Sequence, residues 1–174
     1  MEKNREANVY WTLLKHSQWN MYIAATTEGL CYIGSPNAPF EELVTWVKKW
    51  IPSYTLSEEA SILQPYTMEL VDYLKELRKD FSLPIDLHGT PFQQSVWKAL
   101  QEIPYGQTVS YSDIAKRIEK PTAIRAVGTA IGANPVLIIV PCHRVIAKTG
   151  KLGGFRAGLE MKEELLRVEN SIVI

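Results

Sequence analysis

The sequence contains little cysteine and little histidine. Among its 174 residues are two cysteines, Cys31 and Cys142, and three histidines. Two cysteines are too few for a disulfide framework, and their separation matches no zinc-binding motif. We therefore expect a protein of a reducing compartment, with no bound metal and no other cofactor.

Long apolar runs are also missing. No stretch approaches the ~20 apolar residues of a transmembrane helix, and the first eight residues, which are polar and charged, lack the apolar core of a signal peptide. The composition is 46% apolar and 22% charged, which is ordinary for a globular protein. We expect a cytoplasmic monomer without membrane contact, built as one domain or two small ones.

The net charge is zero overall, but the charged side chains are unevenly distributed along the chain. Although 19 basic side chains balance 19 acidic ones, residues 110–156 contain eight basic and two acidic side chains. Such a local excess fits a surface that faces the phosphates of a nucleic acid. On charge alone, a solvated basic face without a partner remains the alternative.

The first half of the chain predicts a small αβ unit. Runs of aromatic and β-branched residues predict strands at 9–14, 21–25 and 30–34. Apolar residues at helical spacing predict helices at 40–50 and 66–81. The serines, threonines and Pro52 of residues 52–64 predict a loop. The pattern changes within 81–90, so we divide the chain into subdomains 1–85 and 86–174.

The second half predicts short helices. Thr90 is expected to cap a helix whose first residue is Pro91 and which closes at Pro104. Ser110 or Ser112 would cap the next helix and Thr122 the one after it. Segments 110–119 and 122–133 then have the form of a helix-turn-helix.

The second helix of this pair is unusually bare. Arg125 is its one long polar side chain, among Ala123, Ala126, Gly128, Ala130, Gly132 and Ala133. A helix that reads bases in the major groove normally carries several polar side chains. A bare helix with one arginine suits a close, sequence-tolerant approach to the backbone and minor groove. Tight packing in a core is the alternative.

The tetrapeptide Pro141-Cys142-His143-Arg144 follows a run of five apolar residues. A thiolate is the reactive form of cysteine, and nearby positive charge lowers the thiol pKa. His143 and Arg144 could supply that charge, or could polarise the thiol through a water molecule. A free cysteine is otherwise most often a small buried apolar residue.

A set of motifs around this tetrapeptide resembles one family. In order they are Tyr111, Arg125-Ala126-Val127-Gly128, Asn134-Pro135, Pro141-Cys142-His143-Arg144-Val145, Gly153-Gly154-Phe155 and Gly158-Leu159. The set is similar to the O6-alkylguanine-DNA alkyltransferases, strongly over 90–169 and diffusely before residue 85. The resemblance implies an α+β fold: an amino-terminal ribonuclease-H-like subdomain, then a winged-helix-like helix-turn-helix subdomain that carries the cysteine.

The resemblance implies that the protein moves an alkyl group from guanine O6, and possibly from O4-methylthymine, in double-stranded DNA to its own Cys142. The transfer would be irreversible and would occur once per chain. His143 would be the water-linked base, Glu169 its orienting carboxylate, and Asn134 the residue that stabilises the turn. Tyr111 would donate to guanine N3.

The resemblance also implies how DNA is held. Arg125 would fill the gap left by a flipped base, while Ala126 and Gly128 would belong to the minor-groove face. Val145, Gly154, Phe155 and Arg156 would line the substrate pocket, with the Arg156 backbone N–H facing the guanine oxygen.

The sequence departs from the family pattern at two positions and leaves rival functions open. Phe155 replaces a tyrosine and Leu137 a proline found in some members, and no cysteine cluster like the zinc domain of larger relatives is present. A non-catalytic lesion-binding protein would lack Cys142. A helix-turn-helix regulator would need a more polar second helix, and a papain-like hydrolase a distant histidine in a supporting motif.

Overall fold

The structure is a computed structural model that describes residues 6–171. Its amino-terminal part is a four-stranded sheet in the order β3-β2-β1-β4. Strand β1 (Ala7–His16) pairs antiparallel with β2 (Trp19–Thr26), which pairs antiparallel with β3 (Gly29–Ile33). Strand β4 (Tyr54–Glu58) lies parallel to β1 at the other edge. The three strands that the aromatic and β-branched runs predict are confirmed.

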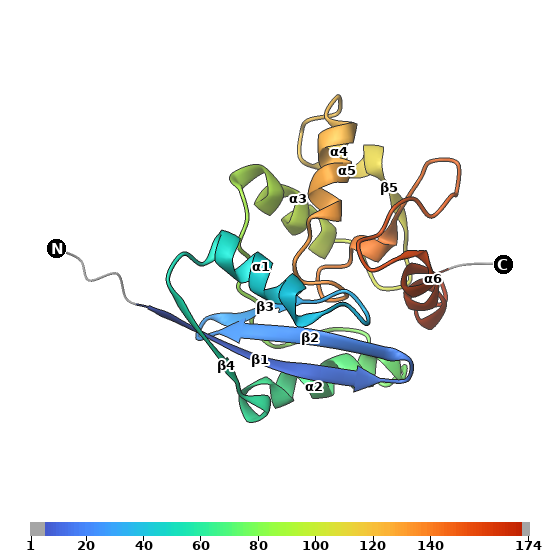
Figure 1. The fold of residues 1–174 in the computed structure, drawn as a ribbon. Helices are drawn as coiled ribbons and strands as arrows, with labels where there is room; N and C mark the ends of the chain where they lie inside the picture. Colours follow the sequence, from blue (N-terminus) through green and yellow to red (C-terminus); the bar gives the residue numbers. More distant parts are fainter. Residues whose placement is uncertain (1–5, 172–174) are drawn as a thin grey trace.

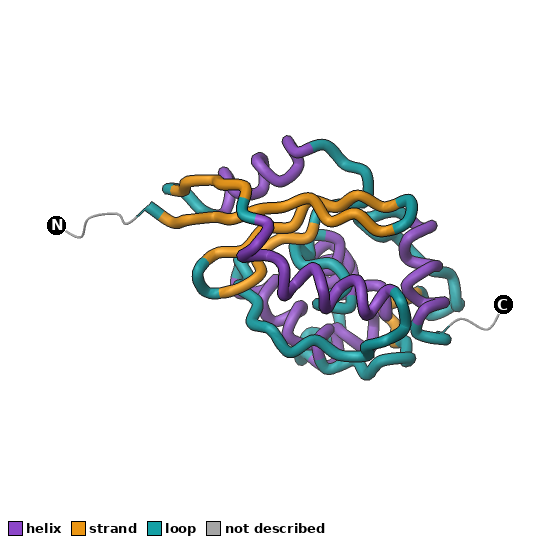
Figure 2. The backbone as a smooth tube through the Cα atoms, turned by 90° about the horizontal axis from the view of Figure 1, so that it is seen from below, coloured by secondary structure: helices purple, strands orange, loops and turns teal. Residues whose placement is uncertain are grey.

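Two helices cover opposite faces of this sheet (Figure 1). Helix α1 (Phe40–Trp50) buries Leu43 and Val47 in a small core with Val9 and Cys31. Helix α2 (Ala60–Leu74) packs on the other face, in the large core that continues into the carboxyl-terminal half. In the view from the side of α2 (Figure 2), this helix crosses in front of the sheet and the carboxyl-terminal helices. Helix α2 is therefore one of the amino-terminal elements that contact the second half.

Two predictions for this region are wrong. Residues 52–64 do not form a loop but contain β4 and the start of α2. Strand β4 is a half-exposed edge strand, so its threonine and serine face solvent and resemble loop residues in the sequence.

The helix predicted at 66–81 ends at Leu74 instead. Glu76 has φ +62°, and the N–H groups of Glu76 and Leu77 bond the carbonyls of Tyr73 and Asp72. This is a Schellman termination with glutamate where glycine is usual, so the sequence carries no stop signal, and Leu77 is 73% exposed.

The carboxyl-terminal half contains four helices and a two-stranded pair. They are α3 (Pro91–Gln101), β5 (Val109–Ser110), α4 (Tyr111–Arg117), α5 (Ile124–Gly132), β6 (Val145–Ile146) and α6 (Leu159–Val168), with β5 and β6 parallel. Thr90 caps α3 in a capping box with Gln93, as the sequence predicts. Ser110 caps α4, but Thr122 does not cap α5, whose first turn follows Ala123 without a side-chain cap.

Candidate active site and DNA-facing surface

Cys142 lies in a tight, buried turn that Asn134 holds together. The Asn134 amide donates to the Val140 carbonyl at 2.8 Å, and its oxygen accepts from the Val136 N–H at 3.0 Å. Cys142 begins a single 3-10 turn, Cys142–Arg144, and its N–H donates to the Val140 carbonyl at 2.8 Å. Asn134 is fully buried and Cys142 is 2% exposed. The position predicted for Asn134, as the residue that stabilises this turn, therefore agrees with its hydrogen bonds.

The same turn is strained at Ile138. Its φ is +72°, and the Ile139 N–H bonds the Leu137 carbonyl two residues back. A γ-turn with positive φ is rare, and a β-branched residue there is an outlier. Such strain persists only where the surroundings impose it, which is common at functional sites.

Burial raises the pKa of the Cys142 thiol, and the Asn134 side chain and the charges of Arg156 and Lys162 offset this rise only in part. The thiol therefore keeps its proton at neutral pH and needs a base to become a nucleophile. Neither His143 nor Arg144 is among the groups that lower the pKa of this thiol. Of the two roles that the sequence left open for them, polarisation of the thiol through a water molecule is the one that remains.

His143 is fully buried beside Glu169. Its Nε2 lies 2.9 Å from the Glu169 Oε1, whereas its Nδ1 is buried without a hydrogen-bond partner. Burial lowers the pKa of His143 despite the carboxylate, so the imidazole is neutral at pH 7. Since Glu169 accepts at Nε2, the proton sits there and Nδ1 is left as a basic nitrogen.

Glu169 is held in place by its helix and by Arg144. It directly follows α6 as its C-cap residue. Asn170 then takes φ +61° and the Ser171 N–H bonds the Leu166 carbonyl, another Schellman termination. The Arg144 Nε and Nη2 donate to both carboxylate oxygens at 2.7–3.2 Å. Burial alone would raise the pKa of Glu169, but the hydrogen bonds from His143 and Arg144 outweigh it and lower the pKa to about 2.

One residue beside Glu169 comes from the amino-terminal half and was not predicted. The Tyr73 hydroxyl, from α2, donates to the Glu169 Oε1 at 2.5 Å and lies 3.4 Å from the His143 Nε2. Tyr73 is fully buried. No local motif marks it, because the contact joins residues 96 positions apart in the sequence.

The loop between β6 and α6 brings further predicted residues close to the turn. A Cβ added to Gly153 would lie 2.6 Å from the Tyr111 hydroxyl, so the loop packs directly on this half-buried phenol. Val145 is buried, Phe155 is half-buried and Gly154 is exposed. Lys162 of α6 is fully buried, and its Nζ donates to the carbonyls of Val145 and Leu152, which links the helix to β6 and the loop.

Arg156 connects this loop to the amino-terminal sheet. Its guanidinium donates to the carbonyl of Ile33 at 2.7 Å and that of Asn134 at 3.2 Å. It also lies 3.3 Å from Glu42 of α1. Arg156 was predicted to offer its backbone to the substrate and its charge to a phosphate-facing surface, whereas its side chain fixes the loop and the Asn134 turn to β3.

Of the predicted DNA-facing residues, Arg125, Ala126 and Gly128 lie on α5, and Tyr111 is the first residue of α4. Val127, Ala130 and Ile131 are buried, while Arg125 and Ala126 are exposed and Gly128 packs on the Tyr111 ring. The exposed face therefore consists mostly of small side chains around Arg125. Exposed Lys116, Arg117 and Lys120 lie on α4 and the turn before α5.

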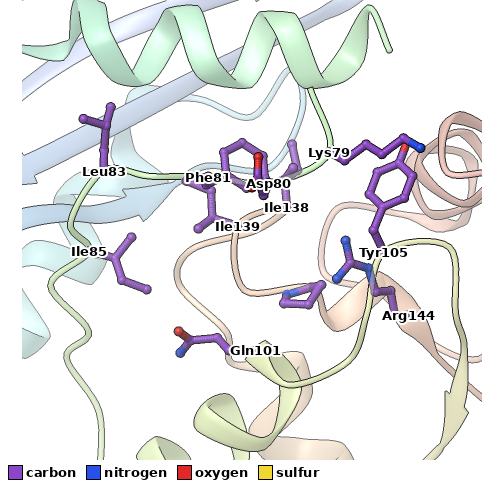
Figure 3. A pocket seen from close by; sticks show the side chains of 11 residues that line it. Lys79, Asp80, Phe81, Leu83, Ile85, Gln101, Tyr105, Ile138, Ile139 and Arg144 are labelled. Carbon is purple, nitrogen blue, oxygen red and sulfur yellow. The ribbon is translucent and has the colours of Figure 1, made fainter. Parts of the chain in front are cut away.

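A cleft of about 500 Å³ lies beside the 79–85 segment, Tyr105 and Arg144 (Figure 3). Its lining includes Pro141, Arg144, Ile138 and Tyr105, together with residues of the 79–85 segment. Cys142 and His143 are not among the lining residues, so this cleft is not the place where a substrate would meet the thiol.

Within residues 6–171, no three side chains of His, Cys, Asp and Glu gather as a metal site would require. In the same part of the chain, no helix is both long and apolar enough to cross a membrane.

The Glu169–Arg144 pair predicts a pH dependence of stability. Glu169→Gln should lower the free energy of unfolding by about 3 kcal/mol near pH 7, because it leaves Arg144 without its buried counter-charge. The pKa of Glu169 is lowered in the folded state, so its contribution is present above the unfolded pKa of about 4.3. It is lost as the pH falls towards 2. Urea unfolding from pH 2.5 to 7 should therefore show the difference between wild type and variant shrinking with acid. A difference independent of pH would contradict the ion pair.

Comparisons with known proteins agree with this geometry. Two family models match the chain: "6-O-methylguanine DNA methyltransferase, ribonuclease-like domain" over residues 9–87, and "6-O-methylguanine DNA methyltransferase, DNA binding domain" over residues 91–171. The inducible methylated-DNA–protein-cysteine methyltransferase of Bacillus subtilis is 56% identical over 97% of this chain and 94% of its own length.

Solved structures show the same fold. The Mycobacterium tuberculosis O6-methylguanine methyltransferase superposes with a TM-score of 0.80 at 36% identity, covering 94% of this chain and 93% of its own. The M. tuberculosis OGT in complex with DNA gives a TM-score of 0.74 at 34% identity and the same coverage of both chains. The α+β fold expected from the sequence is thereby confirmed. The chain belongs to the 6-O-methylguanine DNA methyltransferase family.

Proposed function

We propose that this protein repairs alkylated DNA by transferring the alkyl group of O6-alkylguanine to the Sγ of Cys142. The observation that carries the proposal is the buried base beside the cysteine: a neutral His143 held at Nε2 by Glu169, with a basic Nδ1 that has no partner. Nucleophile, base and orienting carboxylate are the general arrangement that activates a weak nucleophile.

In this reaction the Sγ–carbon bond forms as the carbon–O6 bond breaks. The thiol proton moves to the His143 Nδ1, directly or through one water molecule, so that a thiolate attacks in the buried turn. The departing guanine anion takes up one proton as His143 gives up the one it received. The net change is one alkyl group moved from O6 to sulfur and one proton moved from sulfur to the guanine. The Tyr111 hydroxyl would donate to guanine N3 and reduce the charge on the leaving purine.

The product has no route back to the thiol. A thioether is a poor leaving group, and the other cysteine, Cys31, is fully buried beneath α1 in a different core. The protein would therefore act once per chain.

For DNA binding we propose that α5 lies in the minor groove and that the target base is flipped out of the duplex. The exposed face of small residues supports a close approach, and the exposed Arg125 would fill the gap in the stack. Val145, Gly154, Phe155 and the Arg156 backbone would surround the flipped base. Five large apolar side chains are exposed in residues 6–171: Ile62 and Met68 on α2, and Leu77, Ile124 and Leu159 elsewhere. So small a number supports action as a monomer.

Intact mass spectrometry tests the transfer. After incubation with a duplex containing one O6-methylguanine, the mass should rise by one methyl substitution per chain, located on the Cys142 peptide. Cys142→Ser should gain nothing, while Cys31→Ser, which changes the other cysteine, should react like wild type. Turnover beyond one equivalent, or methylation at Cys31, would sink the proposal.

Base flipping predicts that Arg125→Ala slows the reaction with duplex much more than the reaction with the free base O6-benzylguanine. We expect about a 100-fold loss on saturating duplex, because unstacking costs a few kcal/mol that the arginine offsets, and little change on the free base. Arg117→Ala removes the same charge from α4 and serves as the control, since it should weaken DNA affinity without slowing the saturated rate. Equal losses of Arg125→Ala on both substrates would contradict the flipping role.

A further inference from the structure

The amino-terminal half contributes one side chain to the acceptor site. Tyr73 lies in the last turn of α2, and its hydroxyl donates to the Glu169 Oε1 at 2.5 Å. Glu169 ends α6, so this hydrogen bond joins the two halves of the chain at the carboxylate that contacts His143.

The position of Tyr73 is tightly defined. The Schellman termination at Glu76 fixes the end of α2 directly after it. Its ring centroid lies 5.3 Å from that of Phe81 and 6.1 Å from that of Tyr105, which it meets edge-on, and Tyr73 is fully buried. These contacts hold the hydroxyl oxygen 2.5 Å from the Glu169 Oε1 and 3.4 Å from the His143 Nε2.

The two carboxylate oxygens of Glu169 accept different numbers of hydrogen bonds. Oε2 accepts only from the Arg144 Nε, whereas Oε1 accepts from Arg144, His143 and Tyr73. Arg144 alone holds the carboxylate by a two-pronged contact, so Tyr73 is not needed to anchor it. The hydrogen bond from Tyr73 goes to Oε1, the same oxygen that accepts from His143.

We propose that Tyr73 is a positioning residue for alkyl transfer: its hydroxyl holds Oε1 of Glu169 against His143 and limits how strongly that oxygen attracts the proton of the histidine. The inference rests on the function proposed above. Because the Tyr73 hydroxyl donates to Oε1, this oxygen is a weaker base towards His143. His143 therefore stays neutral, and its Nδ1 stays free to take the thiol proton. Burial raises the pKa of Tyr73, and its phenol therefore remains a donor over the working pH range.

Several charged or titratable groups face this histidine besides Tyr73. They are Arg144 from the same turn, Glu169 at the end of α6 and Lys162 within α6. Tyr105 faces Tyr73 instead. Among these groups Glu169 hydrogen-bonds both His143 and Tyr73, at 2.9 and 2.5 Å, whereas the Tyr73 hydroxyl lies 3.4 Å from the His143 Nε2 itself. The shorter contacts make Glu169 the group through which Tyr73 would act.

Tyr73→Phe removes the hydroxyl and keeps the ring. We expect the transfer rate on saturating O6-methylguanine duplex to fall about tenfold at pH 7, the loss expected when a hydrogen bond to a charged group is removed. Without the donor, Oε1 becomes more basic and the pKa of His143 rises. The acid limb of the rate–pH profile should therefore move to higher pH, while DNA affinity stays unchanged.

Tyr66→Phe is the matched control. Tyr66 lies two turns earlier in α2, is buried, and donates its hydroxyl to the Pro84 carbonyl at 2.7 Å, away from Glu169. It should lose similar stability but keep the wild-type rate and profile. In a Glu169→Gln background, Tyr73→Phe should have no further effect on the profile.

The outcomes separate the two claims. If wild type takes no methyl group, the proposed function fails. Two results with a reactive wild type would overturn only the role of Tyr73. One is a transfer rate of Tyr73→Phe equal to that of Tyr66→Phe, and the other is a slower rate without a shift in the acid limb of the rate–pH profile. Should Tyr73→Phe unfold below the assay temperature, 2,3-difluorotyrosine placed at position 73 gives a stronger donor and should move the acid limb to lower pH. No movement would again overturn the proposal.

Discussion

The acceptor site depends on one buried carboxylate. Glu169 is an ionised group removed from water, a state that is costly unless charge and hydrogen bonds replace the solvent. Arg144 and His143, from the Cys142 turn, and Tyr73, from α2, supply that replacement. The requirement to satisfy Glu169 therefore fixes the relative positions of the Cys142 turn, the end of α6 and the end of α2.

Chemistry follows from the same requirement. A carboxylate with a pKa of about 2 remains an acceptor at any physiological pH, so it directs the imidazole proton to Nε2 and leaves Nδ1 as the base. Because burial keeps Cys142 protonated, the thiol is unreactive until this base takes its proton. Such an arrangement protects a single-use residue from chance reactions, while Asn134 and Arg156 keep the turn and its covering loop joined to the amino-terminal sheet.

The sequence predicted the parts of this site that belong to local motifs. Cys142 and His143 share one turn, Asn134 precedes it, and Glu169 follows an apolar helical pattern, so family motifs locate all four. Tyr73 was missed because its role depends on a tertiary contact from another subdomain. The end of α2 was missed for a related reason: Glu76 takes a left-handed conformation that packing imposes and its residue type does not announce. Strand β4 was missed because an exposed edge strand has the composition of a loop.

The protonation state of His143 tests the central claim most directly. The chain has only three histidines, so ¹⁵N NMR of histidine-labelled protein, with His143→Gln for assignment, can follow this ring from pH 5.5 to 8. The account predicts a neutral imidazole at pH 7 with its proton on Nε2 and an unprotonated Nδ1. An imidazolium at pH 7, or a proton on Nδ1 in place of Nε2, would contradict it.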